Sequence, residues 1–260
     1  HNGQLGLGSS EDIYNFIAVP ALSDGKVVKQ VFAGGFHTMI LAQDGTVFAC
    51  GGNFAGQLGL GDNNGRGTFT AVTTLPEGKV VKQIITGLYT SMIVTEDNRM
   101  INANDVKQIF ACGSNEYGQL GLGDNTHMST FTAVSSLPDE KVVEQVVSGG
   151  LHTLCKAEDG TVFACGNNTF GQLGLADFDN RSVTNNPSSF RETFAISSSL
   201  LNGQVIKEIV TGIQQTFLLV SNTDGTNVRV LACGENDFGQ LGLGDDYTEN
   251  RNILTQVPLR

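Results

Sequence analysis

Short apolar runs alternate with clusters of glycine, asparagine, aspartate and proline along the whole chain. In the first full period the runs cover residues 27–33, 38–41, 46–50 and 69–72. Runs of this length that are rich in valine, isoleucine, phenylalanine and threonine are typical of β-strands. Asp44-Gly45 and Asp159-Gly160 predict hairpin turns, because glycine takes a positive φ without steric cost. Helical periodicity is weak throughout, so we expect about four short antiparallel strands per period.

One pentapeptide recurs along the chain. Gly-Gln-Leu-Gly-Leu begins at Gly3, Gly56, Gly118, Gly171 and Gly239, with spacings of 53, 62, 53 and 68 residues. Four copies lie in a longer sequence, Cys-Gly-x-Asn-x-x-Gly-Gln-Leu-Gly-Leu, here called the frame motif, which begins at Cys50, Cys112, Cys165 and Cys233. A second block precedes each frame motif, at residues 26–31, 79–84, 141–146 and 204–209. Such a period with four strands per repeat favours β-propeller blades over a helical solenoid.

The repeats predict an all-β chain organised as a single array of blades. We expect a β-propeller of four-stranded antiparallel blades, with about four to five blades present. The predicted limits are residues 1–25 for the outer part of a preceding blade, then 26–78, 79–140, 141–203 and 204–260 for the blades that follow.

The frame motif and the upstream Gly-x-x-His-Thr sequences at residues 34–38 and 149–153 resemble the repeat of the regulator of chromosome condensation family. The resemblance covers nearly the whole chain. It implies a seven-bladed propeller, of which these four inner and five outer blocks would form part. The chain departs from the family in carrying Cys where Trp often begins the frame, and we expect neighbouring side chains to fill the space left by the smaller residue.

The residues of the repeat itself are predicted to be structural. The four equivalent cysteines would be spread around a ring, too far apart for one tetrahedral zinc, so we expect buried thiols. His37 and His152 recur without a Ser, Cys or carboxylate at catalytic spacing, and buried polar groups need partners, so we expect structural hydrogen bonds. Thr90 and Gln215 replace them in the other blades. The structural set is Gly56, Gln57, Gly59, Gly118, Gln119, Gly121, Gly171, Gln172, Gly174, Gly239, Gln240, Gly242, His37 and His152.

Charge and cysteine content narrow the function further. The chain has 260 residues, a formal net charge of -11 and a pI near 4.7, which disfavours direct binding to nucleic acid or anionic membranes. Five cysteines without a Cys-x-x-Cys pair suit reduced thiols, and we expect a cytoplasmic protein, or a nuclear one. The motifs indicate no metal, no cofactor and no covalent catalysis.

Partner specificity is expected in loops that do not repeat, since the repeats mainly pack. The candidate partner-binding residues are Asp62, Asn63, Asn64, Asp124, Asn125, Asp177, Asp179, Arg181, Asp245 and Asp246. An acidic face there would steer a basic partner, and the steering would weaken with salt. The alternative is an acidic surface that is merely solvated.

Three functions fit these observations. We rank first a protein-interaction propeller within a larger protein, such as the regulatory region of a ubiquitin ligase, because few proteins with this repeat are established exchange factors. The second, guanine-nucleotide exchange on a small GTPase, is implied by the resemblance, since the founding member acts on Ran with polar residues of one face and a wedge-like insertion. Residues 177–189 are the candidate wedge. The third, chromatin binding, is disfavoured by the acidic charge. The expected partner is another protein, a small GTPase or ubiquitin-ligase machinery.

Overall fold

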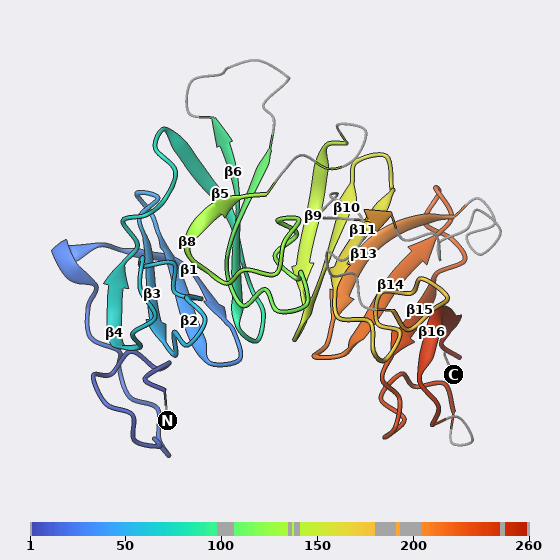
Figure 1. Ribbon diagram of the computed structural model, residues 1–260, viewed down its shortest axis with the longest axis horizontal. Helices are drawn as coiled ribbons and strands as arrows, with labels where there is room; N and C mark the ends of the chain where they lie inside the picture. The colour runs from blue at the N-terminus through green and yellow to red at the C-terminus, as the bar shows by residue number, and fades with distance from the viewer. Residues whose placement is uncertain are drawn as a thin grey trace. The chain divides into compact units, whose positions relative to one another are not determined.

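In the computed structural model the chain forms two compact units (Figure 1). The described residues are 2–97, 107–134, 137, 141–179, 191–192, 204–244 and 248–258. Unit 1 comprises His1–Asn115 and Thr126–Ser135, and unit 2 comprises Glu116–Asn125 and Ser136–Arg260. Each unit holds two four-stranded sheets.

In unit 1 a short 3-10 helix (Ser23–Gly25) precedes two antiparallel sheets whose strands follow chain order. The first sheet contains β1 (Val28–Ala33), β2 (His37–Ala42), β3 (Val47–Gly51) and β4 (Arg66–Ala71). The second contains β5 (Lys79–Thr86), β6 (Thr90–Asp97), β7 (Gln108–Gly113) and β8 (Met128–Ala133).

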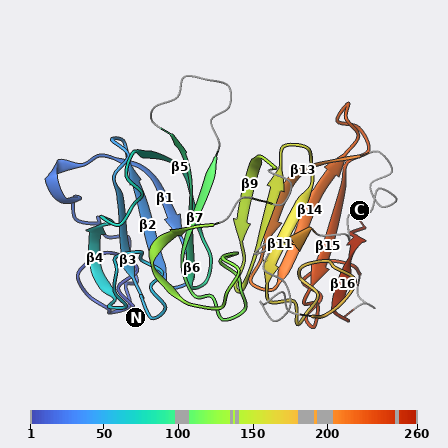
Figure 2. The same ribbon diagram turned by 45° about the horizontal axis from the view of Figure 1, so that its top comes forward.

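Unit 2 repeats this architecture. Its first sheet contains β9 (Val143–Ser148), β10 (His152–Ala157), β11 (Val162–Gly166) and β12 (Arg191–Glu192). Its second contains β13 (Val205–Thr211), β14 (Gln215–Ser221), β15 (Arg229–Gly234) and β16 (Arg251–Gln256). In Figure 2, β1 to β4 lie side by side in chain order, as do β13 to β16. The predicted all-β fold of four-stranded antiparallel blades is therefore confirmed, with four blades described.

The predicted strands of the first blade match β1, β2 and β3 to within one residue at each end. The fourth strand begins at Arg66 rather than at Phe69, because Arg66 pairs with Gly51 while its own sequence, Arg-Gly-Thr, has no apolar alternation. Gly45 has φ 89 and Asp44 Oδ1 accepts the Thr46 N–H at 3.0 Å, as the predicted hairpin turn requires.

The core of each unit lies between its two sheets. In unit 1, Met39 and Val47 of the first sheet and Ile84 of the second belong to one buried cluster, which also contains Leu58 of the frame motif. In unit 2 the corresponding cluster includes Leu173 of the frame motif. The leucine of the repeated pentapeptide is thus a core residue that fills the space between neighbouring sheets.

The repeated glutamine carries the main polar contact between a frame motif and the next sheet. The Gln57 carbonyl accepts a hydrogen bond from Ser91 Oγ of β6 at 2.7 Å and one from the Cys112 thiol of β7 at 3.6 Å. An equivalent hydroxyl and thiol donate to the carbonyls of Gln4, Gln119 and Gln172. A hydroxyl and a thiol at fixed strand positions therefore anchor four copies of the pentapeptide in one way.

The frame cysteine packs close to a frame glycine and to a phenylalanine of a fourth strand. A side chain on Gly59 would come within 2.5 Å of the Phe131 ring and 3.2 Å of Cys112 Sγ. The space beside the small thiol is thus filled by the frame glycine and by a phenylalanine of the fourth strand, as expected from the sequence. All five cysteines are free and buried.

The two repeated histidines extend the same network. Ser91 Oγ donates to the Gln57 carbonyl, so it accepts from His37 Nε2, which lies 2.8 Å away. His152 Nε2 meets Thr216 Oγ1 at 3.1 Å in the same way. The Nδ1 atoms of both rings are buried without a hydrogen-bond partner among the described residues. Protonation would place a charge on these buried nitrogens, and burial lowers the pKa of each histidine to about 4.

Substitution of Gly56 tests the close approach of the frame motif to the neighbouring strand. Gly56 has φ +87, and a Cβ there would lie 2.4 Å from Ser129 Cα. Gly45 has nearly the same φ, +89, but open space around it. Both alanine variants suffer the left-handed strain of about 1–2 kcal/mol, and we expect Gly56→Ala to cost about 1–3 kcal/mol more through overpacking. Denaturant titration measures the difference, and equal midpoints would contradict the packing account.

Stability is predicted to fall as the pH drops from about 6.5 to about 4. The folded-state pKa of His37 and of His152 lies below the ordinary value, so the unfolded chain binds more protons in this window. Each histidine can remove up to ~3 kcal/mol when fully titrated. The double variant His37→Gln, His152→Gln introduces glutamine, which the fourth blade has at the equivalent position, Gln215. Urea unfolding at pH 7 and pH 5 measures how much unfolding free energy each protein loses on acidification. We expect a clearly smaller loss for this variant than for the wild-type chain. An identical loss in both proteins would show that the two histidines do not cause it.

Candidate partner-binding surface

The sheet register brings the predicted binding loops to one end of each blade. His37 pairs with Gly51, so the turn before β2 and the frame motif after β3 lie at the same end of the first sheet. The pairs Thr90 with Gly113 and His152 with Gly166 repeat this arrangement. We call this end the frame end. The described candidate residues, Asp62, Asn63, Asn64, Asp124, Asn125, Asp177 and Asp179, all lie in segments that connect a third strand to the fourth. Arg181, Asp245 and Asp246, and residues 180–189 of the candidate wedge, lie outside the described residues.

The asparagine of the frame motif gives these loops their shape. Asn53 Oδ1 accepts the Leu58 N–H at 2.9 Å, and Asn53 Nδ2 donates to the Asp62 carbonyl at 2.8 Å. Asn168 makes the same two contacts, with the Leu173 N–H and with the Asp177 carbonyl. One buried amide therefore fixes both arms of the loop, so the frame end is presented on a rigid base.

Two of the predicted binding carboxylates are engaged within their own loops. Asp62 Oδ2 pairs with Arg66 at 2.7 Å, and Asp62 Oδ1 accepts the Asn64 N–H at 2.8 Å. The Arg66 guanidinium, followed by the Asn64 N–H, lowers the pKa of the Asp62 carboxyl. Asp177 Oδ1 accepts hydrogen bonds from Asn168 Nδ2 at 2.9 Å and from the Asp179 N–H at 3.0 Å. These carboxylates shape their loops in addition to any contact with a partner.

The other described candidates differ in exposure. Asn63, Asn64, Asn125 and Asp179 are exposed, whereas Asp124 is half-buried. Asn125 Nδ2 donates to the Glu116 carbonyl at 3.0 Å. The exposed members are available at the surface, and their role as partner contacts stays a prediction.

Sequence reasoning missed the aromatic residues at the frame end of unit 1. The Phe36 and Tyr89 rings stack with their centroids 5.0 Å apart and an interplanar angle of 11°. Phe54, the residue after the frame asparagine, is 67% exposed. A comparison of the repeats would have found Phe54, because the equivalent residues in the other frame motifs are Glu116, Thr169 and Asp237.

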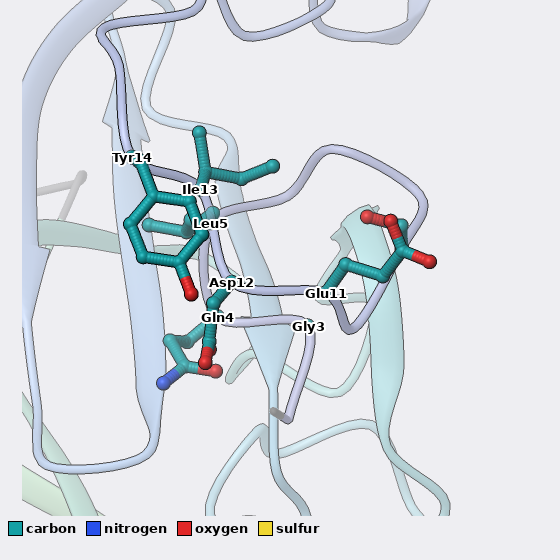
Figure 3. Close-up of a pocket in the computed structure, with 8 residues that line it drawn as sticks. Gly3, Gln4, Leu5, Glu11, Asp12, Ile13 and Tyr14 are labelled. Atoms are coloured by element: carbon teal, nitrogen blue, oxygen red, sulfur yellow. The ribbon is translucent and has the colours of Figure 1, made fainter.

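The segment before the first blade forms a pocket of about 290 Å³ (Figure 3). This segment lies against β4, where Gly8 N–H donates to the Gly67 carbonyl at 2.8 Å. Gly3, Gln4, Leu5, Ser9, Glu11, Asp12, Ile13 and Tyr14 line the pocket. Figure 3 shows Glu11 and Tyr14 extending to opposite sides of it. The lining carries two carboxylates and no basic side chain, which suits a cationic group.

The titratable groups with large pKa shifts are explained by packing. Burial raises the pKa of the Cys50, Cys155 and Cys233 thiols to about 12, so they remain protonated and poorly nucleophilic at neutral pH. Within the part of the chain that the structure describes, no group of three or more His, Cys, Asp or Glu side chains is arranged to hold a metal ion. No helix among the same residues is long and apolar enough to cross a membrane.

Comparison with known proteins identifies similar chains. The Arabidopsis thaliana ultraviolet-B receptor UVR8 is 28% identical over 98% of this chain and 52% of its own length. The Bos taurus secretion-regulating guanine nucleotide exchange factor is 33% identical over 63% of this chain and 33% of its own length. The chain therefore spans about half or less of the relatives it matches.

Solved structures with low sequence identity share the fold. Human WBSCR16 matches with a TM-score of 0.74 and 22% identity, covering 99% of this chain and 61% of WBSCR16. Prp20p from Saccharomyces cerevisiae matches with a TM-score of 0.68 and 19% identity, covering 93% of this chain and 52% of Prp20p. Both likenesses support the propeller architecture.

Models of the regulator of chromosome condensation (RCC1) repeat match most of the chain. One model matches residues 44–94, 108–155 and 159–219, and a second matches residues 28–57 and 143–172. These stretches include the frame motifs that begin at Cys50, Cys112 and Cys165. The chain belongs to the regulator of chromosome condensation (RCC1) repeat family.

Proposed function

We propose that this chain is a non-catalytic propeller module that binds another protein through the frame ends of its blades. The observation that carries the proposal is a division of roles within the repeat. Shared positions, such as the Gln57 carbonyl and its Ser91 and Cys112 donors, hold neighbouring sheets together. Residues that differ between repeats gather in the loops of the frame end. A rigid scaffold with variable loops at one end is suited to recognition.

The chemistry of the described side chains favours binding over acid–base catalysis. His37 and His152 are buried and neutral at physiological pH, and each has a hydroxyl partner in the next sheet. The most depressed carboxyl pKa values, about 2 for Asp44 and Asp159, are caused first by surface ion pairs with lysines in the same blades. These shifts have structural causes, so they do not indicate a proton-transfer site.

The relatives support a protein as the partner. The solved structure of Prp20p is described together with its binding to Gsp1p and to histones. We extend to this chain only the class of partner, another protein. The buried thiols, which oxidation would force out of the core, are compatible with a place in the reducing cytoplasm or nucleus.

Affinity capture with the full chain tests the proposal, with a matched pair of variants. Asn63→Ala, Asn64→Ala alters two exposed residues at the frame end of the first blade, whereas Gln43→Ala alters an exposed residue in the β2–β3 hairpin at its opposite end. We expect the wild-type chain and the Gln43 variant to retain the same partner, and the frame-end variant to lose most of it. Loss with the Gln43 variant alone would place binding at the other end. No partner for the wild-type chain in its own cell extract would refute the proposal.

Nucleotide exchange on a small GTPase is the second candidate, supported by the 33% identity with the secretion-regulating exchange factor. Release of fluorescent GDP from purified GTPases separates the two functions. Under the first proposal we expect release at the intrinsic rate. Acceleration that disappears when residues 180–189 are deleted would instead establish exchange through the candidate wedge. This deletion keeps Asp177 and Asp179, whose hydrogen bond forms a local turn just before the deleted residues.

A further inference from the structure

The frame end of unit 1 carries a cluster of aromatic residues. The cluster consists of the exposed Phe54 and the half-buried Phe36 and Tyr89, with Leu88 at its edge, and we call it the aromatic patch. Phe36 and Tyr89 occupy the turns before β2 and β6, and their rings are stacked at 5.0 Å. Phe36 and Phe54 flank Gly52, since a Cβ there would lie 3.0 Å from the Phe54 ring and 3.5 Å from Phe36 Cβ. The three rings therefore belong to one surface.

Gly52 makes room for this patch rather than for a backbone turn. It is not among the glycines with positive φ, so its backbone would tolerate a larger residue. A Cβ on Gly52 would lie 3.0 Å from the Phe54 ring, whereas the contact of Gly35 with Leu88 recurs in the third blade between Gly150 and Ile213. The positions equivalent to Gly52 in the other blades hold Ser114, Asn167 and Glu235. A side chain is thus missing beside Phe54 in the first blade.

The exposure of Phe54 is not a consequence of its place in the repeat. The equivalent positions carry Glu116, Thr169 and Asp237, all exposed and polar. Burying an aromatic ring stabilises a chain by a few kcal/mol, and leaving it 67% exposed forgoes much of that gain. The sister blades carry their ring one residue later, at Tyr117, Phe170 and Phe238, where the first blade has Ala55. The first blade therefore places its ring at a different position of the frame motif, beside Gly52 and Phe36.

Charge decides which partner suits the patch. The segment that follows Phe54 and leads to β4 carries the carboxylate of Asp62, and the only basic residue there, Arg66, is paired with it. The whole chain has a net charge of -11, so a second copy of it would be repelled. Exposed aromatic faces attract guanidinium and ammonium groups. Resting on the proposed function of protein binding, we propose that the aromatic patch is the docking site for a basic segment of the partner protein, with an arginine or lysine held against the aromatic rings.

The direct test uses fluorescein-labelled peptides built from repeated Arg-Leu-Gly-Ser units. A second peptide replaces each arginine with citrulline, which keeps the shape and removes the charge. We expect the wild-type chain to bind the arginine peptide roughly 2- to 30-fold more tightly than the citrulline peptide in fluorescence anisotropy, the range of a cation–π contact. Equal affinities for the two peptides would overturn the inference.

Matched variants locate the binding. Phe54→Thr installs the residue found at Thr169, so the fold should be kept, and Phe16→Thr makes the same change at a fully exposed ring in the segment before the first blade. Gly52→Ser installs the residue found at Ser114 and should displace the Phe54 ring. We expect the preference for the arginine peptide to disappear in Phe54→Thr, to shrink in Gly52→Ser and to persist in Phe16→Thr. A preference that survives in Phe54→Thr would refute the aromatic patch as its source.

The same variants separate this inference from the broader proposal. If Phe54→Thr retains every partner that the wild-type chain captures from its cell extract, the patch is not the docking site, although the chain is still a binding module. If the wild-type chain captures nothing, the proposed function itself fails. Loss of a captured partner with Phe54→Thr but not with Phe16→Thr, together with release of that partner by the arginine peptide, supports both.

Discussion

The contact on which this architecture depends is a backbone carbonyl inserted between two sheets. The backbone carbonyl of the frame glutamine accepts hydrogen bonds from a hydroxyl and a thiol of the next sheet, as Gln57 does from Ser91 and Cys112. An unpaired carbonyl in such a buried position would cost about 1–3 kcal/mol. The leucine beside it, Leu58, fills the core at the same place. A sheet and the frame motif packed on it therefore depend on each other for both polar and apolar contacts.

This constraint also explains the composition of the repeat. The frame chain passes so close to the neighbouring fourth strand that Gly56 has no room for a Cβ beside Ser129, and Gly59 faces the Phe131 ring. The histidine adds a hydrogen bond from the preceding sheet to the same hydroxyl, and burial of the ring lowers its pKa. Thr90 begins β6, where two other blades have His, so the histidine strengthens the contact without being needed for it.

The sequence alone allowed the strands, the turns and the frame motif to be located, since each depends on local pattern and on exact repetition. The start of β4 was missed, because the polar residues from Arg66 to Thr68 join the sheet by pairing with Gly51, a contact that leaves no hydrophobic signal. The predicted acidic loops were found at the frame end. However, the sequence could not show that the Asp62 carboxylate is paired with Arg66 and accepts the Asn64 N–H, because these contacts depend on the direction of the side chains. The aromatic patch was overlooked for a related reason: attention went to polar loops, whereas its signal is a difference between equivalent positions.

Exact repetition makes such differences informative. The four blades pack with the same residues at most equivalent positions. A residue that differs from its equivalents while the backbone stays the same is not required for this packing, so it is available for another role. Gly52 and Phe54 depart together, one losing a side chain and the other gaining a ring, and a Cβ on Gly52 would lie only 3.0 Å from that ring. A single exposed phenylalanine could be explained by the tolerance of surfaces to apolar residues. Two coupled departures, beside stacked rings of neighbouring turns, are better explained by recognition than by the stability of the blade.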